Sequence, residues 1–215
     1  MVMQSSTSQR FTPDADSARD FALVRALKRA DIINDIILIM QAADQAARWH
    51  KSQKRKGEAA EPYMNHLLEV AALVAQASDG DATCIIAALM HDAVEDQDVT
   101  LEQVRALYGD AVAAIVAEVT DDKSLLKQER KELQVRNASH KSRAASMLKI
   151  ADKTSNVRAV VETPPAHWEL ARKQAYVAWA KAVVEGLPCK PEGLMAQFTA
   201  ATTAAEAAFG SQPTG

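Results

Sequence analysis

Apolar residues recur at spacings of three and four along most of the chain, as they do in amphipathic helices. The pattern runs from about residue 19 to 52, where Ile36, Ile39 and Met40 follow this spacing. It predicts further helices over residues 62–78, 82–96, 110–119, 142–160, 166–187 and 191–209, and a partly helical segment over 121–137.

Turn-forming and capping residues separate these segments. Gly57 and Pro62 interrupt "KSQKRKGEAAEPYMNH", which is predicted to be a loop, and Asp81 is placed to cap the next helix. Thr100 and Gln103 have capping-box spacing and predict a short helix that ends near Gly109. Repeats and linkers are absent, so we expect one domain over residues 19–209, between flexible tails at 1–18 and 210–215.

Composition supports an all-α protein. Of 215 residues 48% are hydrophobic but only 5% are aromatic, and 7 Gly and 7 Pro offer few turns for short strands. A net charge of −3 argues against non-specific binding to nucleic acid. No signal peptide and no apolar run of membrane-spanning length is present, and the two cysteines, far apart in sequence, are typical of reduced thiols. We therefore expect a cytoplasmic protein.

The segment "MHDAVEDQ" at residues 90–97 places four polar groups after the apolar run "CIIAALM". In one continuous helix His91 and Glu95 would share a face, and so would Asp92 and Asp96. Burying carboxylates without partners costs several kcal/mol, and a divalent metal would remove that cost. Imidazole with carboxylate suits Mn, Fe or Zn. The alternative is a helix end that emerges from the core into water.

Three other stretches favour the metal hypothesis. His66 lies at the edge of an apolar helix, and Asp152 lies in the apolar stretch "MLKIAD" with Asn156 one turn further on. The segment "KSQKRK" adds a cluster of basic residues, including Arg55 and Lys56. Two histidines, two aspartates, a further acidic pair and a cationic loop are what metal-assisted hydrolysis of a phosphate ester requires.

Four longer strings carry a resemblance to a known family: "PYMNH", "AALMHDAVEDQDVTLEQV", "EVTDDKSLLKQERKELQV" and "KIADKTSNVR". They are similar to the hydrolase domain of RelA/SpoT proteins in the HD phosphohydrolase superfamily, and more so to its stand-alone small alarmone hydrolases. The resemblance spans about residues 35–186. It implies a single-domain HD-type helical bundle that uses Mn²⁺ to hydrolyse the 3′-pyrophosphate of (p)ppGpp to GDP or GTP and pyrophosphate. It also implies that the protein has no synthetase activity.

The resemblance also implies roles for individual residues. One Mn²⁺ per chain would be bound by His66, His91, Asp92 and Asp152, and Glu95 and Asp96 would activate the attacking water and handle its proton. The remaining positions would bind the nucleotide, with Arg55 stacked on the guanine base: Arg55, Lys56, Asn156, Lys127, Arg172 and Tyr176. His50 is expected to support the site without binding metal.

Some residues depart from the family pattern, and alternative functions stay open. Leu67 replaces a usual proline, and Thr154 and Ser155 replace a bulkier pair, which is expected to alter the pocket wall. Trp168 and Trp179 follow the apolar spacing of their helix and are interpreted as core residues. Two alternatives remain: a phosphohydrolase of another nucleotide such as ppApp or NADPH, and a non-catalytic nucleotide sensor, whose signature would be loss of the acidic pair. The expected partner is a small nucleotide in all of these readings, and the oligomeric state stays open, with a homo-oligomer compatible.

Overall fold

The computed structural model describes residues 15–210, and their side chains from residue 29 onward. The chain divides into two compact units, Met1–Ile37 and Leu38–Gly215, and the helix α1 (Ala15–Trp49) contributes to both. This helix includes residues 15–18, which were predicted to belong to the N-terminal tail. The rest of that predicted tail, residues 1–14, and residues 211–215 of the C-terminal one lie outside the described residues.

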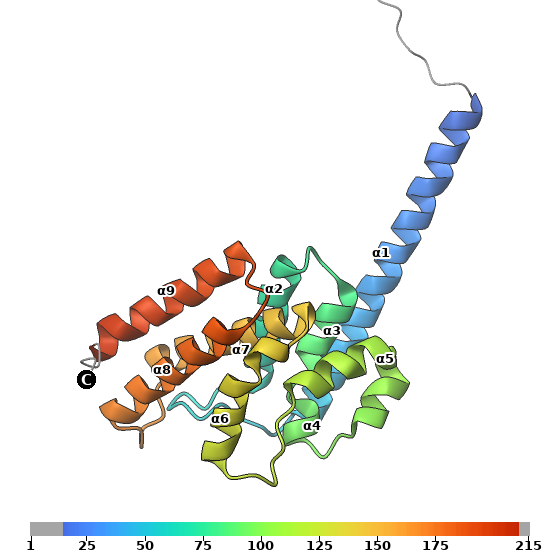
Figure 1. Cartoon of the computed structure of the whole chain (residues 1–215). Coiled ribbons are helices and arrows are strands. Elements are labelled where there is room, and N and C mark those ends of the chain that lie inside the picture. The colour runs from blue at the N-terminus through green and yellow to red at the C-terminus, as the bar shows by residue number, and fades with distance from the viewer. Residues whose placement is uncertain (1–14, 211–215) are drawn as a thin grey trace, which may run out of the picture. The chain divides into compact units, whose positions relative to one another are not determined.

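The second unit is built from helices joined by short connections (Figure 1). They are α2 (Met64–Ala77), α3 (Ala82–Met90), α4 (Ala93–Asp96), α5 (Leu101–Val119), α6 (Lys127–Arg136), the 3₁₀ turn η1 (Ala138–His140), α7 (Arg143–Glu162), α8 (Leu170–Gly186) and α9 (Glu192–Phe209). Within the described residues β-pairing is limited to an isolated bridge between Lys54 and Pro62. The predicted all-α fold is confirmed. None of the described helices has both the length and the hydrophobicity to span a membrane.

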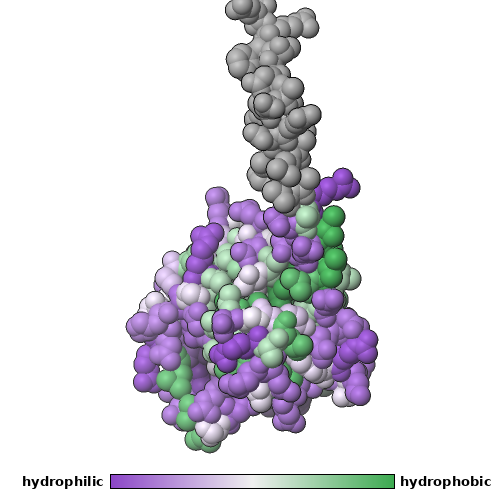
Figure 2. Space-filling view, turned by 90° about the vertical axis from the view of Figure 1, so that its right-hand side faces the viewer, coloured by the Kyte–Doolittle hydropathy of each residue, from purple (hydrophilic) through white to green (hydrophobic). Residues whose placement is uncertain are grey.

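Helix α7 is the central helix of this unit. It packs against α2, α5, α8 and α9, and its apolar side chains Leu148, Ile150 and Val157 are almost completely buried. It also buries the ionisable residues Asp152 and Lys153. Buried charged groups need partners, so α7 is where a functional site is expected. The face of the unit shown in Figure 2 is mostly hydrophilic, with smaller hydrophobic patches.

Local capping explains several helix starts. The Asp81 side chain accepts a hydrogen bond from the Cys84 amide, and Thr100 and Gln103 form the predicted capping box. The two helices predicted over 100–119 form the single element α5, which is kinked at Gly109. The Gly109 φ of 86° lies in the left-handed region that a residue without Cβ adopts at little cost.

The prediction of one continuous helix over residues 82–96 is wrong, because the helix is interrupted in its middle. α3 ends at Met90, and the chain turns at His91 and Asp92 before α4 begins at Ala93. Asp92 has φ −101° and ψ −3°, away from regular helical values. His91 and Glu95 therefore do not share a face of one continuous helix. The turn instead directs His91 and Asp92 toward α2 and α7.

Candidate active site

A cavity of about 430 Å³ opens in the second unit, between the loop at residues 53–57 and helices α6, α7 and α8. The structure brings nearly all of the predicted site residues to its wall, although they come from distant parts of the sequence. These are Arg55, Lys56, His91, Asp92, Glu95, Asp96, Lys127, Asp152, Asn156, Arg172 and Tyr176. His66 is 1% exposed and lies beneath the wall, against Asp92 and Asp152.

The predicted metal ligands converge at one end of the cavity. Ligand atoms of His66, His91 and Asp92 lie within 4.8 Å of one another. The Nε2 atom of His91 is 3.1 Å from Asp92 Oδ2, and the Nε2 atom of His66 is 3.6 Å from the same oxygen. Asp152 Oδ1 completes the group at 3.4 Å from His66 Nε2 and 3.9 Å from His91 Nε2. This group could hold a metal ion.

Hydrogen bonds at the other ring nitrogens test whether a cation fits. His91 Nδ1 is 2.7 Å from the Ala88 carbonyl, which only accepts, so Nδ1 carries a proton. His66 Nδ1 is 2.8 Å from the Ser155 hydroxyl. Both Nε2 atoms are buried without a hydrogen-bond partner and face carboxylate oxygens. If both rings are neutral, bare nitrogen lone pairs face carboxylate oxygens, an arrangement that a bound cation would stabilise.

The electrostatics of the cluster also favour positive charge beside its carboxylates. Burial opposes charge on His91, but Asp92 and Asp152 outweigh it and raise its pKa to about 9. Burial also opposes ionisation of Asp152, yet Lys153 and the two histidines hold its pKa below its ordinary value. The carboxylates are therefore ionised, and Lys153 together with a proton on His91 or a bound metal ion can balance them. The donor set of imidazole and carboxylate suits a first-row divalent ion.

Neighbouring side chains orient the two carboxylates. Asp92 Oδ2 accepts a hydrogen bond of 2.6 Å from the Tyr63 hydroxyl. Asp152 accepts a hydrogen bond of 2.6 Å from Asn156 Nδ2 and one of 2.9 Å from Lys153 Nζ. His50 stacks on the Tyr63 ring with centroids 5.3 Å apart and is not among the clustered ligand atoms. Such partners fix ligand orientation and tune the ligands.

The acidic pair Glu95 and Asp96 borders the same cavity but differs in its contacts. Asp96 is held on both oxygens, at 2.8 Å from Gln53 Nε2 and 2.5 Å from Lys123 Nζ. Glu95 has only long contacts, 3.4 Å to the Asp121 amide and 3.4 Å to Arg130 Nη1. Burial raises the pKa of Glu95, and the charges of Asp92 and Asp121 raise it further. Glu95 is therefore the carboxylate better suited to exchange a proton.

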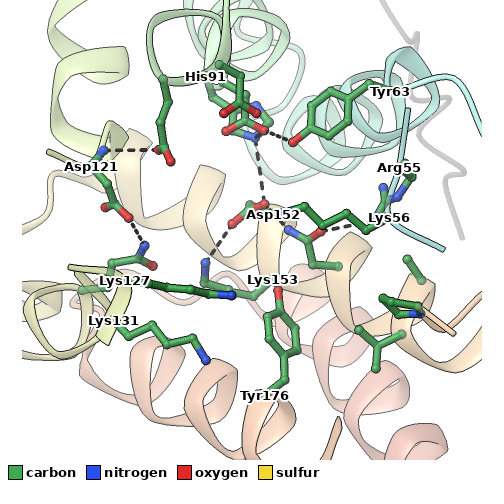
Figure 3. A pocket seen from close by; sticks show the side chains of 18 of the residues that line it. Arg55, Lys56, Tyr63, His91, Asp121, Lys127, Lys131, Asp152, Lys153 and Tyr176 are labelled. Atoms are coloured by element: carbon green, nitrogen blue, oxygen red, sulfur yellow. Dashed lines mark hydrogen bonds and ion pairs between the residues drawn. The ribbon is translucent and has the colours of Figure 1, made fainter. Parts of the chain in front are cut away.

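The remaining wall of the cavity is cationic. Figure 3 shows Lys127, Lys131 and Lys153 on one side of Asp152 and His91 on the other. Ten basic and five acidic side chains line the cavity, an excess of five positive charges, whereas the whole chain carries −3. Partial burial and the like charge of Lys127 lower the pKa of Lys131. Crowded cations without enough carboxylates form a binding site for an anion.

The sequence analysis named Lys127 but missed the cavity residues Lys131 and Lys153. Lys127 and Lys131 are one helical turn apart on α6, a spacing that could have suggested a shared face. The interpretation of Trp168 and Trp179 as core residues is wrong, because both are only partly buried, lie outside the core cluster and line the cavity. Lys131 Nζ lies 4.6 Å and Lys153 Nζ 4.3 Å from the centroid of the Trp179 ring, which supports both cations.

Comparisons with known proteins agree with this architecture. Residues 42–181 match the HD domain family. The guanosine-3′,5′-bis(diphosphate) 3′-pyrophosphohydrolase MESH1 of Xenopus tropicalis is 44% identical over 155 residues, which are 72% of this chain and 87% of that protein. The human protein of the same name is 45% identical over 150 residues, 69% of this chain and 84% of its own length.

A solved structure supports the same relationship. It belongs to a metazoan orthologue of SpoT that hydrolyses ppGpp and plays a role in starvation responses. Its TM-score is 0.74 at 38% sequence identity, and the match covers 77% of this chain and 94% of that one. This chain therefore belongs to the HD domain family and, within it, to the group of SpoT-related 3′-pyrophosphohydrolases.

Proposed function

We propose that the protein hydrolyses the 3′-pyrophosphate of (p)ppGpp, releasing GDP or GTP and pyrophosphate, with one Mn²⁺ per chain. One observation carries the proposal: the His/Asp cluster and an acidic pair lie at one end of a cavity whose other walls are cationic. The names of the relatives, 44% and 45% identical to this chain, point to the same reaction.

His66, His91, Asp92 and Asp152 would hold the ion, which when bound supplies Lewis-acid polarisation of a phosphoryl group. Imidazole and carboxylate donors together are compatible with Mn²⁺. The two buried, unpartnered Nε2 atoms support the assignment of both histidines as ligands. The carboxylate of Asp152 stays in place through Asn156 and Lys153.

The acidic pair would manage protons during hydrolysis. Water attacks the phosphorus attached to the 3′ oxygen, the bond between that phosphorus and the 3′ oxygen breaks, and the 3′ oxygen takes up a proton. Glu95, with its raised pKa and long contacts, is suited to accept the proton of the attacking water. Asp96, held by Gln53 and Lys123, is suited to orient that water.

The other walls would bind the nucleotide. Lys127, Lys56 and Arg172 offer charge for phosphate groups, with Lys131 and Lys153 alongside. Arg55 presents a planar guanidinium to a purine base. Its two terminal nitrogens are held at 3.3 Å from Ser155 Oγ and 3.2 Å from Asn156 Oδ1, which leaves its faces free to stack. Tyr176 and Asn156 would complete the nucleotide pocket.

The test is a turnover panel on the purified protein with Mn²⁺: ppGpp, pppGpp, ppApp and NADPH, with products separated by anion-exchange chromatography. The proposal expects GDP and pyrophosphate from ppGpp in equal amounts. Preferential turnover of ppApp or NADPH would assign another phosphohydrolase activity. Tight binding of ppGpp without any product would instead identify a nucleotide sensor, and either result would overturn the proposal.

A further inference from the structure

The hydroxyl of Ser155 joins three side chains from outside its own helix. Ser155 lies on α7 with 1% of its surface exposed. Its Oγ is 2.8 Å from His66 Nδ1, 2.6 Å from Glu69 Oε2 and 3.3 Å from Arg55 Nη1. We propose that Ser155 is a positioning residue that orients His66 for metal binding and ties the Arg55 loop to the metal centre. The inference rests on the function proposed above.

The direction of these hydrogen bonds follows from the donors available. A hydroxyl has one proton, and Ser155 gives it to Glu69, whose carboxylate only accepts. Glu69 is held in turn by Arg158, whose Nη1 lies 2.8 Å from Glu69 Oε1. The Ser155 oxygen is therefore left to accept from His66 Nδ1. That bond places the proton of His66 on Nδ1 and keeps Nε2 bare, directed at Asp92 and Asp152.

The same hydroxyl is half of a clamp on Arg55. One terminal nitrogen of the guanidinium donates to Ser155, and the other donates to Asn156 Oδ1 at 3.2 Å. Asn156 donates in turn to Asp152 Oδ1 at 2.6 Å. Each branch of the clamp thus ends at a proposed metal ligand, His66 on one side and Asp152 on the other. Hydrogen bonds thus connect both proposed ligands to the residue assigned to the base.

The neighbouring Thr154 shows what a purely structural hydroxyl does at this position. Its Oγ1 donates at 2.7 Å to the Ile150 carbonyl one turn back on α7, and the residue is fully buried. Buried serine and threonine residues in helices commonly use this bond. Ser155 forms its hydrogen bonds with other elements instead. Thr154→Val therefore serves as the matched control, since it removes an adjacent buried hydroxyl without touching His66 or Arg55.

The experiment compares Ser155→Ala, Ser155→Thr and Thr154→Val in the full chain, stripped of metal by a chelator. Mn²⁺ affinity is measured by calorimetric titration, and the tautomer of His66 by ¹⁵N NMR of its ring. Ser155→Ala should bind Mn²⁺ about 10- to 100-fold more weakly, the range typical of lost partners behind metal ligands. Its KM for ppGpp should also rise, while its apo-protein melting temperature stays near that of Thr154→Val.

The variants distinguish the effect of the Ser155 hydroxyl on Mn²⁺ affinity from the effect of side-chain packing. Ser155→Thr keeps the hydroxyl and should restore most of the affinity, and Thr154→Val should bind as wild type does. The inference is wrong if Ser155→Ala binds Mn²⁺ like wild type, or if Ser155→Thr and Ser155→Ala lose affinity equally. If wild type itself neither binds Mn²⁺ nor hydrolyses ppGpp, the proposed function fails. If wild type does both and Ser155→Ala is unchanged, only the positioning role fails.

Discussion

Replacing Glu95 with Gln separates proton transfer from metal binding. The amide has nearly the same shape but is neutral and is not basic. Glu95 is not among the clustered His and Asp groups, and its contacts to Asp121 and Arg130 are both long at 3.4 Å. We therefore expect Glu95→Gln to fold normally and to keep its Mn²⁺ while losing the group that accepts the proton.

The size of the loss follows from the role assigned to Glu95. A general acid–base group contributes about 10²- to 10⁴-fold to rate. That factor corresponds to about 3–5 kcal/mol of activation free energy. Asp96 is a weaker substitute, because Gln53 and Lys123 already occupy its two oxygens. We therefore expect kcat on ppGpp to fall by at least about 10²-fold.

The pH dependence of activity gives a second test of the role assigned to Glu95. Burial and the charges of Asp92 and Asp121 raise the pKa of Glu95, and its carboxylate form is the one that accepts a proton. Wild-type kcat/KM should therefore fall as pH drops through that raised pKa, at a higher pH than for an ordinary glutamate. In Glu95→Gln this descent should disappear from the residual activity.

The assay is kcat/KM for ppGpp across the pH range, with bound Mn²⁺ quantified by elemental analysis of each preparation. Glu102→Gln is the matched control, because its carboxylate is exposed on the first turn of α5 and lies outside the cavity. Turnover of Glu95→Gln within threefold of wild type would refute the assigned role. Loss of the ion from this variant would show that Glu95 is itself a ligand.

Four further substitutions test the rest of the site. Asp152→Ala should lose both bound Mn²⁺ and activity, as measured by metal analysis and turnover. Arg55→Lys keeps the positive charge but removes the planar guanidinium. It should raise KM by about fivefold, equivalent to about 1 kcal/mol of stacking free energy. Lys56→Ala should raise KM more at low salt than at moderate salt, because exposed charges are screened. Gly57→Ala would bring a Cβ against the Thr163 carbonyl oxygen, so the basic loop must shift; KM should rise while Mn²⁺ affinity stays at the wild-type value.

Much of the fold could be predicted because apolar spacing determines which helix faces are buried. The capping box of Thr100 and Gln103 lies where its spacing indicated. The break between α3 and α4 could not be predicted, because "MHDAVED" contains no glycine or proline. The contacts that accompany this turn are tertiary: His91 Nε2 faces Asp152, and Asp92 accepts from the Tyr63 hydroxyl. Such contacts leave no local signal in the sequence.

Site residues that belong to a sequence motif could be named in advance. Residues that reach the site only through the packing of distant segments could not. Ser155 stood out only as a departure from the family pattern, and its bonds to His66, Glu69 and Arg55 depend on three segments meeting. Lys153 was overlooked although it follows Asp152 directly. A run of charges usually marks a solvated helix face, and only the packing of α6 and α8 beside α7 turns these lysines inward.

The net charge of a chain does not show how its charges are distributed around a cavity. A chain with a net charge of −3 still gathers an excess of five positive charges around one cavity. The charged groups of the cavity are separated in space. The carboxylates of Asp92 and Asp152 face the two histidines, whereas Lys127 and Lys131 lie away from these carboxylates and have lowered pKa values. A bound cation would balance the first group, and a bound anion would balance the second. The proposed pair of a phosphorylated nucleotide and a divalent ion would satisfy both groups, which neither ligand would do alone.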